Sequence, residues 1–213
     1  MKSTVNDLDN DVIVGTEIED EHDEIVGEVI KRLEENDLYV KPEKCKWKVR
    51  EVEFLGVVIG PEGIKMEKVK VREVLEWPTP KCVKDVQNFL GLVNYYCRFI
   101  QGFASIVRPL YDMVKKDRKW KWMEKQEEAF EELKKRFMQE PVLAALDLDK
   151  KMRMEMDASD YATEGVLSME REDGKWRLVA FLSKSLNETE RNYWQSSGVG
   201  ELETLVERGA IQV

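Results

Sequence analysis

The chain has 213 residues, of which 42% are hydrophobic and 36% are charged, and this composition is typical of a soluble folded protein. It contains no apolar run of about 18 residues, so we expect no membrane-spanning helix. Three cysteines without a CxxC pair and a single histidine, His22, argue against a disulfide framework and against zinc. We therefore expect free thiols and an intracellular location, cytoplasmic or nuclear.

The formal net charge of −9 is concentrated near the N-terminus. Residues 1–37 carry 13 acidic and three basic side chains, which leaves 30 acidic and 31 basic ones in residues 38–213. Residues 41–50 hold five bases against one acid, and residues 65–136 hold 17 against 11. Phosphate binding depends on such local surpluses, because screening limits each charge to about 10 Å at 0.1 M salt. Charge alone is equally consistent with nucleic-acid binding and with ordinary solvated faces.

The N-terminal part of the chain predicts short strands and one acidic helix. The apolar run VIVGT, residues 12–16, is typical of a buried strand, and residues 19–36 place Ile25, Val29 and Leu33 on one helical stripe. The segments that follow are LYV, the turn KPEK, CKWKV, EFLGVVI and the turn residues Gly60, Pro61, Glu62 and Gly63. This part predicts the edge of an α+β domain.

From residue 67 to residue 139 the apolar side chains recur with a helical period. Their four stripes are Val71, Val74 and Leu75; Val83, Val86, Phe89, Leu90 and Val93; Ile106, Leu110, Met113 and Val114; and Ala129, Phe130, Leu133 and Phe137. They predict a small helical subdomain that ends at Pro141.

The segments MRMEMD, GVLSME and KWRLVAFLS then predict an antiparallel three-stranded meander, with a turn at Asp173 and Gly174. Residues 187–190, NETE, have the spacing of a capping box and predict the start of a helix. The order of helices, three strands and a helix indicates an α+β fold.

Two acidic residues lie at the end of the first strand of this meander and in the turn after it. In the run MEMDASDY the methionines alternate with charged residues, so Asp157 ends the strand on its solvent-side face and Asp160 begins the following turn. Asp157 is a candidate metal ligand. The alternative is turn chemistry alone, because Asp and Ser often start turns and one carboxylate is not a metal site.

Read in order, these segments resemble the Pol polyprotein of gypsy-type long-terminal-repeat retrotransposons, from the end of the reverse transcriptase palm through the thumb into the RNase H domain. The segments that carry the resemblance are KPEKC, EFLGVVI, FLGLVNYYCRFIQGF, EEAFEELK, EPVL, MDASDYA, GKWRLVAFLSKSL and ERNY. The resemblance implies a palm remnant over residues 1–65, a helical thumb over residues 66–139 and the N-terminal part of an RNase H-like domain over residues 140–213.

The polymerase centre of this family carries an aromatic residue, any residue and two aspartates before a strand like VIVGT. On that alignment Leu8 takes the aromatic position, Asn10 the first aspartate and Asp11 the second. Such polymerases hold two metal ions with aspartates, and an amide cannot supply the negative charge. We therefore expect no polymerase activity from the chain alone.

For the RNase H part, the resemblance implies that Asp157 is the first metal-binding carboxylate and that Mg²⁺ or Mn²⁺ is the cofactor. The second metal-binding carboxylate of the family is a glutamate on the next helix. The best candidate is Glu201, if the match past ERNY contains two extra residues, and Glu203 is the weaker candidate. Glu164 is a departure, since small residues are usual at its position. Because the sequence stops at Val213, before the remaining ligands, we expect a truncated domain that binds metal poorly and does not cut RNA/DNA hybrid.

The thumb of this family lies against the primer and template backbone. The implied nucleic-acid contacts are Phe54, Leu55 and Gly56 of the FLG motif, together with Lys84, Tyr95 and Arg98. Phe89, Leu90 and Phe99 are expected in the core, and Cys97 replaces a base of the usual motif.

Three functional hypotheses follow from these observations. The chain is a segment of a reverse transcriptase/RNase H polyprotein whose activity requires further sequence, a non-catalytic nucleic-acid-binding module, or a decayed retroelement product without function. The expected partners are RNA/DNA hybrid or primer–template duplex, with the rest of a Pol polyprotein as another candidate, and no membrane.

Overall fold

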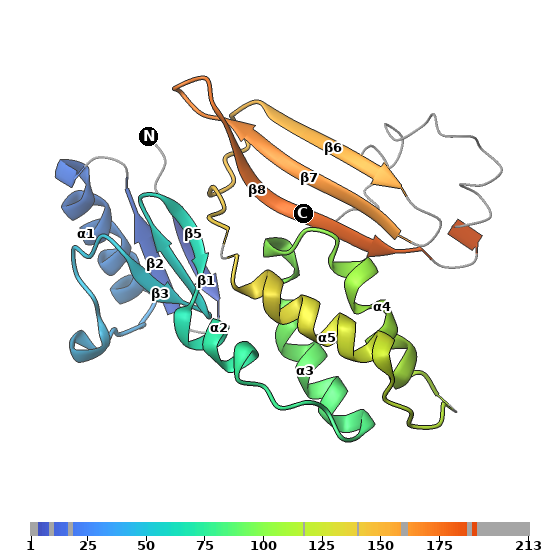
Figure 1. Ribbon diagram of the computed structural model, residues 1–213. Helices are drawn as coiled ribbons and strands as arrows, with labels where there is room; N and C mark the ends of the chain where they lie inside the picture. The colour runs from blue at the N-terminus through green and yellow to red at the C-terminus, as the bar shows by residue number, and fades with distance from the viewer. Residues whose placement is uncertain are drawn as a thin grey trace. The chain divides into compact units, whose positions relative to one another are not determined.

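The structure, a computed structural model, describes residues 4–8, 11–16, 19–116, 118–139, 141–158, 162–186 and 189–190 (Figure 1). The backbone divides into two compact units, one ending at Val49 and one beginning at Arg50. No helix within the described residues is long and apolar enough to cross a membrane. Cys45, Cys82 and Cys97 are free thiols, as the sequence predicts.

The first unit contains a hairpin and one helix. Strands β1 (Thr4–Leu8) and β2 (Asp11–Gly15) pair antiparallel, and α1 (Glu19–Glu35) follows at the predicted place. A 3₁₀ turn, η1 (Pro42–Lys44), comes after it. The CKWKV segment forms no strand; instead Lys48 pairs with Asp23 of α1 at 2.8 Å.

The second unit begins with a small antiparallel sheet of β3 (Val52–Phe54), β4 (Val57–Gly60) and β5 (Gly63–Met66). The apolar run EFLGVVI is therefore not one strand. It folds back at Leu55 and Gly56, whose φ angles of 47° and 79° match the two-residue turn that suits a hairpin. This sheet also contacts the segment that follows the last helix. The backbones of Ile64 and Leu143 exchange hydrogen bonds of 2.7 and 2.9 Å.

The predicted helical subdomain is present as α2 (Lys68–Leu75), α3 (Val83–Tyr95), the 3₁₀ turn η2 (Cys97–Phe99), α4 (Phe103–Val114) and α5 (Glu124–Phe137). Most residues of the predicted stripes face inward and form one core, although Val83 and Met113 lie outside it. The core includes the fully buried side chains Phe89, Leu110, Phe130, Leu133 and Phe137. Phe89 packs on Phe130 with ring centroids 4.7 Å apart. Leu90 and Phe99 are buried as expected.

The predicted meander is confirmed as β6 (Met152–Ala158), β7 (Ala162–Glu170) and β8 (Trp176–Ser185), paired antiparallel in chain order. Figure 1 shows this sheet beside the start of α4. The helix predicted after residue 187 falls mostly outside the described residues.

Two hydrogen bonds with backbone N–H donors help attach the sheet to the rest of the second unit. Ala144 N–H donates to the carbonyl of Leu178 in β8 at 2.6 Å, and Ala104 N–H at the start of α4 donates to the Ser183 hydroxyl oxygen at 2.8 Å. The fold is therefore α+β, as the sequence predicts, and the second unit contains a helical layer and two three-stranded sheets, of which the sequence predicted only the later one. The domain boundaries at residues 65 and 139 stay a prediction.

Candidate nucleic-acid interface

The FLG turn is held by two tyrosines at the end of α3. The Tyr96 hydroxyl donates a 2.8 Å hydrogen bond to the carbonyl of Gly56, and the neighbouring Tyr95 hydroxyl donates to the carbonyl of Leu55. Tyr96 is 1% exposed, and its burial raises the pKa of its hydroxyl to about 12. The structure thus brings together three of the sequence-predicted contacts, Leu55, Gly56 and Tyr95.

Only glycine fits at position 56 of the FLG turn. Its φ is +79°, and a Cβ would lie 2.7 Å from the Tyr96 hydroxyl oxygen. Glu67 N–H also donates to the Gly56 carbonyl, at 3.1 Å. Glycine at this position therefore serves the turn and its contact with α3, while Leu55 stays exposed beside Tyr95.

The outer face of α3 carries a polar stripe. Positions four, seven and eleven residues apart lie on one face of a helix, and here they are Lys84, Asn88, Gly91 and Tyr95, all exposed. We call these four residues the α3 stripe. At 1.5 Å per residue, Lys84 and Tyr95 are about 16 Å apart along the helix axis.

Gly91 leaves a gap in the middle of this stripe. A Cβ added there would meet no atom within 4 Å, so no packing contact requires a glycine. Asn88 and Gly91 were not among the predicted contacts, although their spacing from Lys84 and Tyr95 could have identified them in the sequence.

Arg98 lies on η2, just after the α3 stripe. Its guanidinium is exposed and stands 5.8 Å from the centroid of the Phe99 ring, and no described carboxylate forms an ion pair with it. Lys84 likewise has no ion-pair partner among the described residues. Both cations are therefore available to phosphates. Phe54, by contrast, is half-buried at the end of β3.

The candidate metal ligands are not assembled into a site by the described residues. Asp157 is exposed near the end of β6, and its cross-strand partner is Glu164. Glu164 accepts a hydrogen bond from Ser105 at 2.8 Å. Within the described ranges, no three His, Cys, Asp or Glu side chains come together as a metal site would need, so the residues present there do not fit a two-metal centre.

The other predicted ligands cannot be placed beside Asp157. Asp11 begins β2 in the first unit, and only its backbone is described. Asn10, Asp160, Glu201 and Glu203 lie outside the described residues. The assignments of Glu201 and Glu203 as ligands, of Asn10 as the replacement of an aspartate ligand and of Asp160 as a turn residue stay predictions.

Comparison with known proteins supports the resemblance. The family described as "RNase H-like domain found in reverse transcriptase" matches residues 122–199. The transposon Tf2-3 polyprotein of Schizosaccharomyces pombe is 34% identical over 184 residues, which are 86% of this chain. The transposon Tf2-7 polyprotein of the same yeast is 34% identical over 186 residues. The chain is homologous to the reverse transcriptase and RNase H region of retrotransposon polyproteins. It spans 14% of the length of these curated relatives.

Solved structures agree on the fold. The foamy viral protease-reverse transcriptase in complex with RNA/DNA hybrid matches 88% of this chain and 25% of its own, with a TM-score of 0.74 and 24% identity. The same protein in complex with double-stranded DNA matches 96% of this chain and 41% of its own, with a TM-score of 0.74 and 23% identity. The chain therefore shares the fold of the matched segment of the foamy viral protease-reverse transcriptase.

Proposed function

We propose that this segment of a reverse transcriptase/RNase H polyprotein binds RNA/DNA hybrid or primer–template duplex through the α3 stripe and the adjoining FLG turn, and that it is not catalytic on its own. The observation that carries the proposal is Gly91, an open glycine in the middle of an exposed polar helix face.

An exposed glycine in a helix interior costs about 1 kcal/mol relative to alanine. No atom of the described residues packs against Gly91, so that part of the fold gains no compensating contact from it. Glycine does permit another molecule to approach the helix backbone closely. A duplex lying across α3 at Gly91 explains why this position lacks a side chain.

The residues on either side of Gly91 suit a nucleic-acid duplex. Helices with A-form geometry present a wide, shallow minor groove lined by 2′-hydroxyls and base edges. The Asn88 amide can donate and accept hydrogen bonds there, and the Tyr95 ring is positioned by its bond to Leu55. Lys84 and Arg98 stand at the two ends and can contact the sugar–phosphate backbone.

The foamy viral relatives of this fold were solved with RNA/DNA hybrid and with double-stranded DNA, which supports the same ligand class here. Enzymes of this kind use divalent metal ions. We propose that Asp157, Asp11 and Glu201 belong to metal centres completed by other parts of the polyprotein. Asn10 in place of an aspartate favours a binding role over polymerase activity for this segment.

The test replaces Gly91 and compares it with a second open helical glycine, Gly27 in α1. A Cβ at Gly27 also meets nothing within 4 Å. We expect Gly91→Leu to weaken binding of a labelled 20-base-pair RNA/DNA hybrid at least about tenfold, a loss of about 1.4 kcal/mol. Gly27→Leu should leave binding within about twofold. Equal affinities for the two variants would refute the proposed interface.

A further inference from the structure

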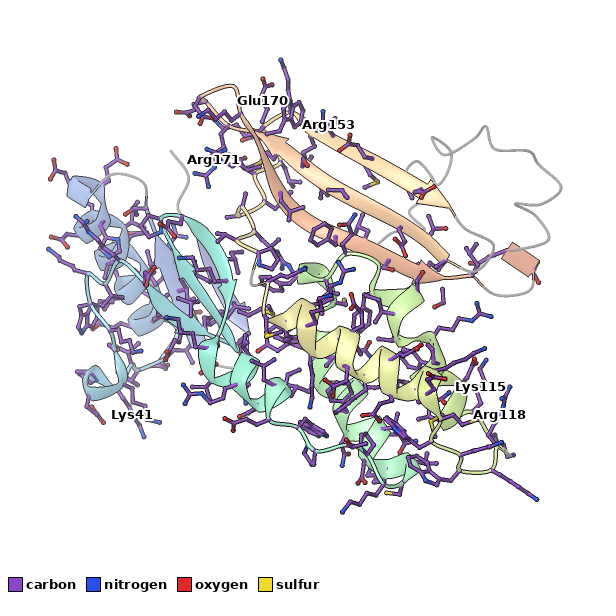
Figure 2. The ribbon with its side chains drawn as sticks, in the orientation of Figure 1. Lys41, Lys115, Arg118, Arg153, Glu170 and Arg171 are labelled. Carbon is purple, nitrogen blue, oxygen red and sulfur yellow. The ribbon has the colours of Figure 1, made fainter. Side chains whose placement is uncertain are left out.

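The turn between α4 and α5 is the most basic short segment of the second unit. Residues 115–122, KKDRKWKW, hold five bases, one acid and two tryptophans. We call this segment the basic–aromatic loop. Figure 2 labels Lys115 and Arg118, which lie on this turn at the end of the helical layer. The duplex interface on α3 does not use any of these residues.

The described residues leave most of the cations in the loop without an ion-pair partner. Lys115 pairs with Asp112 at 2.6 Å. No described carboxylate pairs with the four other exposed bases, Lys116, Arg118, Lys119 and Lys121. Four positive charges that no described carboxylate pairs with lie within six residues and repel one another, so an anionic ligand at this turn would remove an unfavourable interaction.

The two tryptophans form a stacked pair with an anchored and an outer member. Their ring centroids are 5.9 Å apart and the planes are 25° from parallel. Trp122 is the anchored member: its indole N–H donates to Glu127, and its ring meets the fully buried Phe130 edge-on at 6.0 Å. Trp120 is the outer member and is 37% exposed.

The loop is also remote from the sheet. The start of α4 lies against Ser183 and Glu164 of the sheet, whereas the loop follows the other end of that helix. Twelve helical residues separate the two ends by about 18 Å at 1.5 Å per residue. A ligand on the loop would therefore not compete with Asp157 or its neighbours for space.

The combination of features distinguishes among ligands. Proteins that bind single-stranded nucleic acid pair a basic track with aromatic side chains on which bases stack. Membrane-surface segments instead use a broad apolar face on an amphipathic helix. Residues 118–123 form no helix, and their exposed apolar side chains are only Trp120 and Met123. The single-stranded ligand fits these observations better.

We propose that the basic–aromatic loop binds single-stranded nucleic acid, with a base stacked on Trp120 and phosphates held by Arg118, Lys119 and Lys121. This contact is separate from the duplex interface of α3 and would hold a single-stranded extension of the template or primer. It extends the proposed function and can fail or succeed independently of it.

The first test measures binding of a labelled 20-nucleotide oligodeoxythymidine to the whole chain at low salt. Trp120→Leu should weaken binding at least about fivefold, the lower range for one lost stacking contact. Trp176→Leu is the matched control, because Trp176 is 38% exposed but lies on β8, away from the loop. That variant should stay within about twofold of the unchanged chain. Equal effects of the two substitutions would overturn the proposal.

A second variant tests the charges. Lys119→Gln/Lys121→Gln should flatten the slope of log affinity against log salt for oligodeoxythymidine by about 1.4, at about 0.7 for each phosphate contact. Lys175→Gln, a change at an exposed lysine in the β7–β8 turn, should change the slope little. An unchanged slope for the double variant would overturn the proposal.

Two further ligands separate this proposal from its alternatives. Vesicles of phosphatidylserine and phosphatidylcholine should bind no more weakly to Trp120→Leu than to the unchanged chain; a loss on vesicles without a loss on oligodeoxythymidine would make the loop a membrane contact. Gly91→Leu should weaken hybrid binding and leave oligodeoxythymidine binding unchanged. If Gly91→Leu has no effect on the hybrid but Trp120→Leu weakens oligodeoxythymidine binding, the loop proposal stands and the duplex interface fails.

Discussion

Ser105 donates a 2.8 Å hydrogen bond to the Oε1 atom of Glu164 and thereby joins the start of α4 to strand β7. The same helix end has no side-chain cap of its own, and Ser183, the cross-strand partner of Glu164, accepts the Ala104 N–H. Glu164 thus has a structural role in this chain. It helps attach the RNase H-like sheet to the helical layer.

Replacing Glu164 should loosen this attachment. Glu164→Ala removes the acceptor for Ser105 and should lower the free energy of unfolding by about 1 kcal/mol, the usual net worth of a hydrogen bond. Glu155→Ala on the same sheet changes a surface pair with Arg153 and should cost less than about 0.5 kcal/mol. Urea denaturation of the two variants measures the difference, and equal costs would contradict the structural role of Glu164.

Tyr96 should make the free energy of unfolding fall as the pH rises above about 10. Its pKa of about 12 lies above the value of about 10 for an exposed tyrosine, so the folded state holds the hydroxyl proton more tightly. This contribution is complete below pH 10 and is lost as pH rises from 10 to 12. Tyr96→Phe should therefore cost about 1 kcal/mol at pH 8, where the bond to Gly56 is lost, and little or nothing at pH 11.

The check on Tyr96 is urea denaturation of the unchanged chain and of Tyr96→Phe at the two pH values. Tyr39→Phe serves as the control, since Tyr39 is 81% exposed in the first unit. A cost of Tyr96→Phe that stays constant from pH 8 to pH 11 would show that burial does not raise the pKa as stated.

Gly91→Ala should stabilise the fold. The position is helical with open space around it, so the gain is about 0.5–1 kcal/mol, and Gly27→Ala should behave similarly. Thermal unfolding followed by circular dichroism measures both. A destabilising Gly91→Ala would mean that the glycine serves the packing of α3, and the argument for a ligand at this position would lose its basis.

The chain alone should not cut RNA/DNA hybrid in Mg²⁺ or Mn²⁺. The physical reason is that hydrolysis of this kind uses two metal ions held by several carboxylates, and the described residues bring no three such side chains together. Glu164, the cross-strand partner of Asp157, is engaged by Ser105. A gel assay with labelled hybrid measures cleavage. Turnover that disappears in Asp157→Asn would contradict the prediction.

Periodicity was sufficient to predict most of the second unit. The spacing of Phe89, Phe130 and Leu133 identified the helices and their buried faces, and the alternation around Met154 identified the meander. These patterns are readable because each side chain's environment repeats with the period of its own element.

Other features had no local signal. Leu55 adopts a φ of 47° in a turn where Asn or Asp usually precedes Gly, so no turn signal marks the fold-back inside EFLGVVI. Strand β1, TVNDL, has too little apolar alternation to be recognised. The Ser105–Glu164 bond joins residues 59 positions apart, and only the assembled fold brings them together.

The most direct test of the binding account is fluorescence anisotropy of a labelled RNA/DNA hybrid with the purified chain across a salt series. We predict tight binding at low salt and a steep negative slope of log affinity against log salt, which Lys84→Gln/Arg98→Gln should flatten by about 1.8, at about 0.9 for each phosphate contact. No binding at low salt, or a slope unchanged in the double variant, would contradict the proposal that α3 and η2 hold the duplex.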